Sequence, residues 1–111
     1  MTPGAEAFLL HFVLAYVGGL IAVLSVPMAT GGVDRNSFYG FRTPKTMSDD
    51  RIWNVANRAV GRAGIAAGLA VNAFEIVSAI LRWPFGVAVA APVVAVVGIF
   101  VYGLALSATS P

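Results

Sequence analysis

Seven residues between positions 36 and 57 have side chains that suit them to bind a partner or to order a loop. They are Asn36, Gly40, Arg42, Thr43, Thr46, Trp53 and Asn57. Amides and hydroxyls form hydrogen bonds, a guanidinium pairs with carboxylate or phosphate groups, and an indole offers a large contact surface. Headgroup anchoring needs basic and aromatic residues but not this ordered spacing, so the set predicts a partner-binding surface.

A simpler interpretation of the same segment stays open. Each basic residue near an anionic leaflet contributes about 1 kcal/mol of binding, and aromatic rings prefer the headgroup level. Phe38, Tyr39, Phe41 and Trp53 would then act as interfacial anchors. Direct nucleic-acid binding is not expected, because the basic patch is small and includes acidic residues. The acidic residues are Asp34, Asp49 and Asp50.

Three further polar residues, His11, Asn72 and Glu75, lie inside long apolar stretches. A buried ionised carboxylate costs several kcal/mol unless it is paired, so Glu75 must take up a proton or find a partner. We predict a contact between His11 and Glu75. The alternatives are that Glu75 faces a second copy in an oligomer or leans toward the outer membrane interface.

The same inventory argues against an enzyme. The chain has one histidine and no cysteine, and no serine is an obvious nucleophile beside His11. A metal site needs several His or carboxylate ligands, and Gly31-Gly32 lacks the Lys-Ser/Thr continuation of a phosphate-binding loop. We therefore expect no catalytic residue, no metal and no cofactor.

The elements that hold these residues are predicted to be membrane helices. The 111 residues are 59% hydrophobic and 11% charged, whereas a soluble domain has about a quarter charged residues. Three stretches meet the length of about 20 apolar residues that a spanning helix needs. They are Ala7–Met28, Ala63–Leu81 and Gly86–Ser107. We predict one all-α membrane domain over residues 1–111, a three-helix bundle whose second and third spans are joined by a tight turn at Arg82-Trp83-Pro84-Phe85.

Charge placement predicts the orientation. Of the seven Lys and Arg residues, six lie in the segment 29–62 and only Arg82 lies elsewhere. Cytoplasmic loops carry the excess of basic residues. We therefore expect this segment and the C-terminus in the cytoplasm of a bacterial cell, with the N-terminus and the Arg82 turn outside. A cleaved signal peptide is not expected, because Met1–Glu6 has no basic residue.

The segment 29–62 has recognisable local signals. Gly31-Gly32 favours a helix end, Asn36 and Gly40 favour turns, and Thr43 before Pro44 should be extended. A helix is predicted to begin at a Ser48 N-cap. Its apolar residues recur at helical spacing, and a polar face is formed by Arg51, Asn54, Arg58 and Arg62. We predict an amphipathic helix that lies at the membrane interface and joins the second span.

Small and polar residues recur at three- and four-residue steps on each span, which favours close helix packing. The predicted stripes are His11, Ala15, Gly18, Ala22 and Ser25; then Gly61, Gly64, Gly68, Asn72, Glu75 and Ala79; then Ala91, Ala95, Gly98 and Tyr102.

The residues 35–61 resemble the signature of the SdpI family of small membrane proteins. The resemblance is carried by Arg35-Asn36-Ser37-Phe38-Tyr39-Gly40-Phe41-Arg42-Thr43-Pro44-Lys45-Thr46, then Ser48, Trp53, Asn57 and Gly61. It implies one helix, a cytoplasmic motif and two more helices. It also implies a relation to an immunity protein that protects its cell from a secreted toxin and holds a transcriptional repressor at the membrane.

Three functions follow as hypotheses. The first is an SdpI-like protein that acts in immunity or signalling by binding and sequestering a toxin peptide or a regulatory protein. The second is a small proton-coupled transporter that works as a homo-oligomer, with Glu75 as the protonated site and Asn72 as a helper. The third is an accessory subunit of a larger membrane complex.

Overall fold

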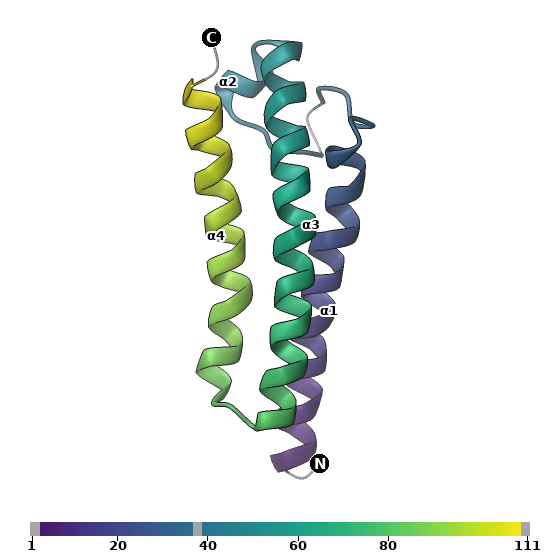
Figure 1. The fold of residues 1–111 in the computed structure, drawn as a ribbon, viewed down its shortest axis with the longest axis vertical. Coiled ribbons are helices and arrows are strands. Elements are labelled where there is room, and N and C mark those ends of the chain that lie inside the picture. The colour runs from purple at the N-terminus through teal and green to yellow at the C-terminus, as the bar shows by residue number, and fades with distance from the viewer. Residues whose placement is uncertain (1–2, 37–38, 110–111) are drawn as a thin grey trace.

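The computed structural model describes residues 3–36 and 39–109, and these residues form an all-helical bundle as predicted. Three long helices, α1 (Pro3–Ala29), α3 (Asp50–Leu81) and α4 (Phe85–Thr109), run side by side, and a short helix α2 (Pro44–Met47) lies between α1 and α3 in the chain (Figure 1). Each long helix contains one predicted span. Each is long and apolar enough to cross a membrane.

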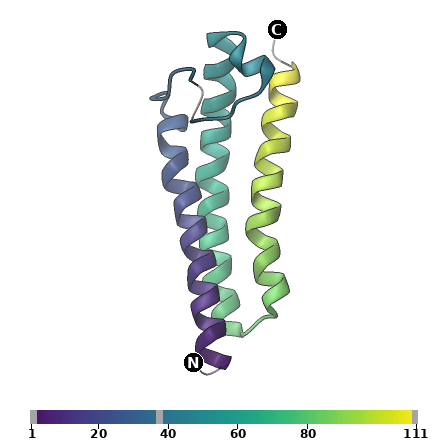
Figure 2. The same cartoon turned by 180° about the vertical axis from the view of Figure 1, so that it is seen from behind.

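The helix α3 lies in the middle of the bundle and packs against both α1 and α4, which touch each other much less (Figures 1 and 2). The bundle measures 53 × 22 × 19 Å, so its long axis exceeds the hydrocarbon thickness of about 30 Å. Large apolar side chains such as Phe8, Ile80 and Val94 point outward along its length. Such a surface suits lipid rather than water.

The predicted amphipathic helix and the second span form one continuous helix. α3 has 32 residues and is therefore about 48 Å long. Its first half stands upright in the bundle instead of lying in the membrane plane, because its small residues continue the packing against α1. The predicted Ser48 N-cap is one residue early. Asp49 accepts hydrogen bonds from the amides of Arg51 (2.7 Å) and Ile52 (3.3 Å), whereas Ser48 donates back to Lys45 O.

The ends of α1 and α3 use the same left-handed stop. Gly31 has φ +76°, and the amides of Gly31 and Gly32 donate to Met28 O and Pro27 O, as the predicted glycine stop requires. At the end of α3, Arg82 takes the left-handed conformation (φ 56°, ψ 44°), and Trp83 N donates to Ser78 O. The turn predicted from Pro84 therefore depends on a strained arginine.

The predicted stripes of α1 and α3 meet each other. A Cβ atom built at Gly61, Gly64 or Gly68 would collide with α1 at Ala29, Ser25 and Ala22, respectively. The two backbones therefore approach more closely than larger side chains would allow. Along the same seam, Asn72 Nδ2 donates to Ala15 O across the helix pair at 2.9 Å.

The predicted stripe of α4 is wrong at Gly98 and Tyr102, whereas Ala91 and Ala95 are half-buried. A Cβ atom added at Gly98 would meet no other part of the described chain within 4 Å, and Tyr102 is 45% exposed. The buried positions are instead Ala88, Pro92, Gly103 and Ser107. The side chain of Phe41 lies against Gly103, and this contact turns a different face of α4 toward the bundle.

Candidate functional site

The polar motif forms a folded unit at one end of the bundle, which we call the cap (residues 33–36 and 39–60). At its centre, Asn57 is 2% exposed. Its Oδ1 accepts from Phe41 N at 2.6 Å, and its Nδ2 donates to Phe41 O (3.2 Å) and Trp53 O (3.0 Å). The side-chain amide of Asn57 thus provides hydrogen-bond partners for the backbone N–H and C=O of Phe41, which lies in a loop outside any helix.

The two threonines around Pro44 close a small loop onto this centre. Thr43 is extended (φ −132°, ψ 165°), as predicted for a residue before proline. Thr43 N donates to Thr46 Oγ1 (2.8 Å) and Thr46 N donates to Thr43 Oγ1 (3.2 Å), which is a capping box for α2. The Thr46 hydroxyl also donates to Phe41 O at 3.1 Å.

Trp53 fixes the other side of the loop. The residue is 1% exposed and its Nε1 donates to Val33 O at 2.9 Å. Gly40 has φ +109°, and a Cβ at this position would meet the ring of Trp53 and the side chain of Asn57. Gly40 is therefore required both for its backbone conformation and for the space it leaves.

Phe41 joins the cap to the bundle, a role that the interfacial-anchor interpretation missed. It is 7% exposed and packs with Ala56, Val60 and Ile99. Its ring meets Phe100 edge-to-face, with centroids 5.7 Å apart. Phe38, also predicted as an anchor, lies outside the described residues.

Asn36 shapes the first turn of the cap. Its Nδ2 donates to Asp34 O (2.7 Å) and Tyr39 O (3.0 Å), and its Oδ1 accepts from Tyr39 N (2.7 Å). These bonds match the predicted turn role. The Tyr39 hydroxyl donates to Leu24 O on α1, which ties the turn to the first helix. Arg42, by contrast, is exposed.

The seven residues predicted as a binding surface therefore have different positions. Thr46, Trp53 and Asn57 are buried and bonded inside the cap, and Gly40 makes room for them. A partner can reach Arg42 directly but can reach these buried side chains only if the cap opens. Their geometry is that of a scaffold that fixes the loop.

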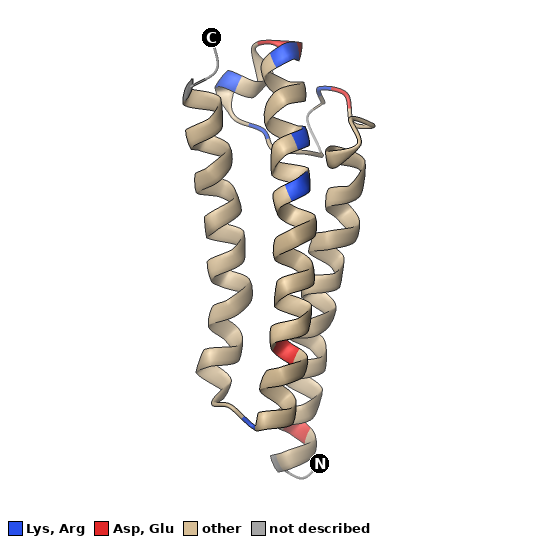
Figure 3. Cartoon of the chain, in the orientation of Figure 1, with Lys and Arg blue, Asp and Glu red and all other residues tan. Residues whose placement is uncertain are grey.

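The exposed side of the cap is carried by α3. Four exposed polar residues recur on this helix at helical spacing, the last of them just beyond the cap: Arg51, Asn54, Arg58 and Arg62. We call this set the basic face. The guanidinium of Arg58 also lies over Gly31, and Arg35 forms a salt bridge with Asp50 (3.4 Å). Figure 3 shows most of the basic segments at the cap end of the bundle, where acidic segments also lie. Further acidic segments and one basic segment lie toward the opposite end.

The intramembrane polar residues meet near the opposite end. His11 Nδ1 lies 2.7 Å from Ala7 O and His11 Nε2 lies 3.1 Å from Ser78 Oγ. A carbonyl only accepts, so Nδ1–H donates to Ala7 O, and Nε2 is hydrogen-bonded to the Ser78 hydroxyl. The predicted contact places Glu75 beside His11, but the side-chain hydrogen bond of His11 goes to Ser78. Ser78 was not predicted, although it lies three residues after Glu75 on the same side of α3.

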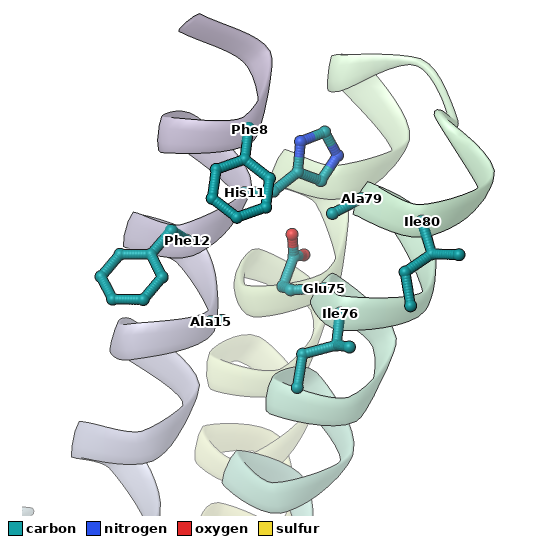
Figure 4. A pocket seen from close by; sticks show the side chains of 8 residues that line it. All are labelled: Phe8, His11, Phe12, Ala15, Glu75, Ile76, Ala79 and Ile80. Atoms are coloured by element: carbon teal, nitrogen blue, oxygen red, sulfur yellow. The ribbon is translucent and has the colours of Figure 1, made fainter. Parts of the chain in front are cut away.

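Glu75 nonetheless lies beside His11. Its side chain is 0% exposed, and neither carboxylate oxygen has a hydrogen-bond partner among the described residues. His11 and Glu75 line the same cavity between α1 and α3 (Figure 4). Within the described part of the chain, no three His, Asp or Glu side chains gather closely enough to share a metal ion.

Fold and sequence together define a multi-pass membrane protein with three candidate spans. The family model described as the SdpI/YfhL protein family matches residues 33–103, which include the cap, α3 and most of α4. The chain therefore belongs to the SdpI/YfhL family. It is also 38% identical over 58 residues to the uncharacterized protein YfhL of Bacillus subtilis (strain 168). That match covers 52% of this chain and 48% of the relative, about half of each. No solved structure matches the chain.

Proposed function

We propose that this protein binds and sequesters a peptide or a regulatory protein at the cytoplasmic side of the bacterial plasma membrane. The proposal rests on the separation, within the cap, of buried residues that hold the loop from exposed basic residues that a partner can contact. Buried Asn57, Thr46 and Trp53 hold the loop, while Arg51 and Arg58 stay exposed on the basic face. Such an arrangement suits recognition of an acidic surface.

The proposal requires the cap in the cytoplasm and the N-terminus outside. The concentration of basic residues at one end supports this orientation. Because the chain has no cysteine, single cysteines at exposed Ser48 and Gly86 provide reporters at opposite ends. An impermeant maleimide should label the Gly86→Cys variant in intact cells and the Ser48→Cys variant only after lysis. Labelling of Ser48→Cys in intact cells would reverse the topology and remove the proposal.

The partner is tested by placing a photo-crosslinking amino acid at Asn54, in the middle of the basic face. We expect a protein adduct in living cells that Arg51→Glu combined with Arg58→Glu abolishes. The matched control is Arg82→Glu, which makes the same kind of substitution at the opposite end and should leave the adduct intact. If only lipid adducts form, the basic face is a headgroup anchor and sequestration is wrong.

Immunity is one form of this function, and it has its own test. Cells lacking the protein should lose viability in medium conditioned by the parent strain, and the wild-type chain should restore it. The double charge reversal on the basic face should fail to restore viability at equal membrane abundance. Equal survival of cells with and without the protein would argue against immunity. Binding of a regulatory protein would then be the remaining form of the proposed function, and the crosslinking experiment at Asn54 tests it.

Glu75 favours a second candidate, a proton-coupled transporter that works as an oligomer. A buried carboxylate without a hydrogen-bond partner is a typical proton-carrying group inside a membrane protein. In proteoliposomes with a proton gradient, the wild-type chain should drive uptake of a substrate and Glu75→Gln should not. Uptake that persists in Glu75→Gln would exclude this mechanism.

A further inference from the structure

Among the residues that the structure describes, none forms a hydrogen bond with the buried carboxylate of Glu75. Its neighbours are already engaged, since His11 bonds to Ala7 and Ser78, and Asn72 bonds to Ala15. Both oxygens of Glu75 are left without a hydrogen bond among the described residues. A buried polar group without a hydrogen-bond partner destabilises the protein. A ligand that supplied the missing donors would remove this penalty, and its binding free energy would be more favourable as a result.

A cavity of about 180 Å³ adjoins this carboxylate. Figure 4 shows Glu75 reaching up between the two helices toward His11, with Phe8 and Phe12 on α1 and Ile76 and Ile80 on α3 around it. Apart from His11 and Glu75, the walls are apolar. The volume resembles that of an apolar protein cavity of about 150 Å³ that holds benzene, so one aromatic ring or a short alkyl chain fits.

The cavity can be reached from the lipid side. Phe8 is 66% exposed and Ile80 is 72% exposed, so the rim lies on the outer surface of the bundle. A second recess of about 580 Å³ shares Phe8, His11, Ala79 and Ile80 with it and continues to Arg82 at the turn. The combined space leads from the end of the bundle to Glu75.

From this geometry we propose that the cavity between α1 and α3 binds a small organic cation, a primary ammonium group carried on an apolar body. The ammonium donates to the oxygens of Glu75, and the apolar body packs among Phe8, Phe12 and Ile76. An ammonium offers three donors to a carboxylate that has no bond, and the ionised pair makes a strong hydrogen bond. A divalent metal ion fits poorly, because it needs several oxygen ligands and the cavity has one carboxylate.

The test compares two probes that differ only in their polar end, phenethylammonium and 2-phenylethanol. Binding to the purified full chain in detergent is measured by calorimetry, in the absence of any membrane gradient or protein partner. Failure here would therefore leave sequestration by the basic face and proton-coupled transport untouched. We expect phenethylammonium to bind between about 10-fold and about 100-fold more tightly than the alcohol, as a hydrogen bond to a charged group allows.

Glu75→Gln keeps the shape of the side chain and should erase this preference, so that both probes bind alike. The matched control is Glu6→Gln on α1, which removes a carboxylate at the same end from an exposed position outside the cavity. It should bind as the wild-type chain does. Equal affinity of the wild-type chain for the two probes, or equal loss in both variants, would overturn the proposal.

A second variant keeps the proposal testable if Glu75→Gln does not fold. Ala79 lines both the cavity and the adjoining recess, so Ala79→Leu should fill space and weaken binding of both probes. The wild-type comparison of ammonium and alcohol needs no variant at all. Unchanged binding in Ala79→Leu would place the probes elsewhere and refute the assigned cavity.

Discussion

Replacing Asn57 with alanine should release the loop around Phe41 from α3 while the three long helices remain. Asn57 makes three hydrogen bonds in a site that is 2% exposed. The carbonyl of Phe41 keeps the Thr46 hydroxyl as a donor, but Phe41 N loses its acceptor. A buried donor without a partner costs about 1–3 kcal/mol. Because two further hydrogen bonds of Asn57 are lost as well, we expect closure of the loop to weaken by the upper part of this range, about 2–3 kcal/mol.

This loss is measured by hydrogen exchange of the Phe41 amide. A weakening of about 2–3 kcal/mol corresponds to exchange that is faster by between about 30-fold and about 150-fold. Amides in the middle of α1 and α4 should keep their rates, because the helix seam is untouched. The local effect separates loss of the cap from general unfolding.

Asn54→Ala is the matched control, since it is the same substitution on the same helix at an exposed position. It should leave the exchange rate of the Phe41 amide within about 2-fold of the wild-type value, as expected for a surface substitution. If Asn57→Ala and Asn54→Ala exchange alike, the hydrogen bonds of Asn57 do not hold the loop. The scaffold interpretation of the motif would then be wrong.

Three further substitutions test the helix contacts and the turn. Gly64→Leu should separate α1 from α3 and prevent a stable bundle, whereas Gly98→Leu should be tolerated because a side chain at that position meets no neighbour within 4 Å among the described residues. The two variants are compared by their resistance to detergent-induced unfolding. Arg82→Gly should raise the free energy of unfolding by up to about 1 kcal/mol by relieving the left-handed arginine, and an unchanged or lower value would contradict that strain. A double-mutant cycle between His11→Ala and Ser78→Ala should give a coupling energy between about 0.6 and about 1.7 kcal/mol, and strictly additive effects would refute their bond.

Several local features of the fold were readable from short stretches of sequence. Apolar length predicted the three long helices, and Gly31-Gly32, Asn36, Gly40 and Thr43 adopt the conformations that their chemistry favours. The stripes that line the contact between α1 and α3 were also predicted, because small residues at three- and four-residue steps mark one face of a helix. These signals depend on a residue and its near neighbours alone.

What the sequence determined, then, is which segments are helices, where they stop and which faces of α1 and α3 are suited to close packing. The tertiary structure decided the rest, because burial and hydrogen-bond partners depend on residues far apart in the chain. Asn57 and Trp53 are buried because the loop folds back over α3. The ring of Phe41 lies against Gly103, and this contact sets which face of α4 packs against the bundle. Likewise, Ser78 forms the hydrogen bond to His11, and the carboxylate of Glu75 faces a cavity. His11 and Ser78 are 67 residues apart, so no local sequence signal could predict their pairing.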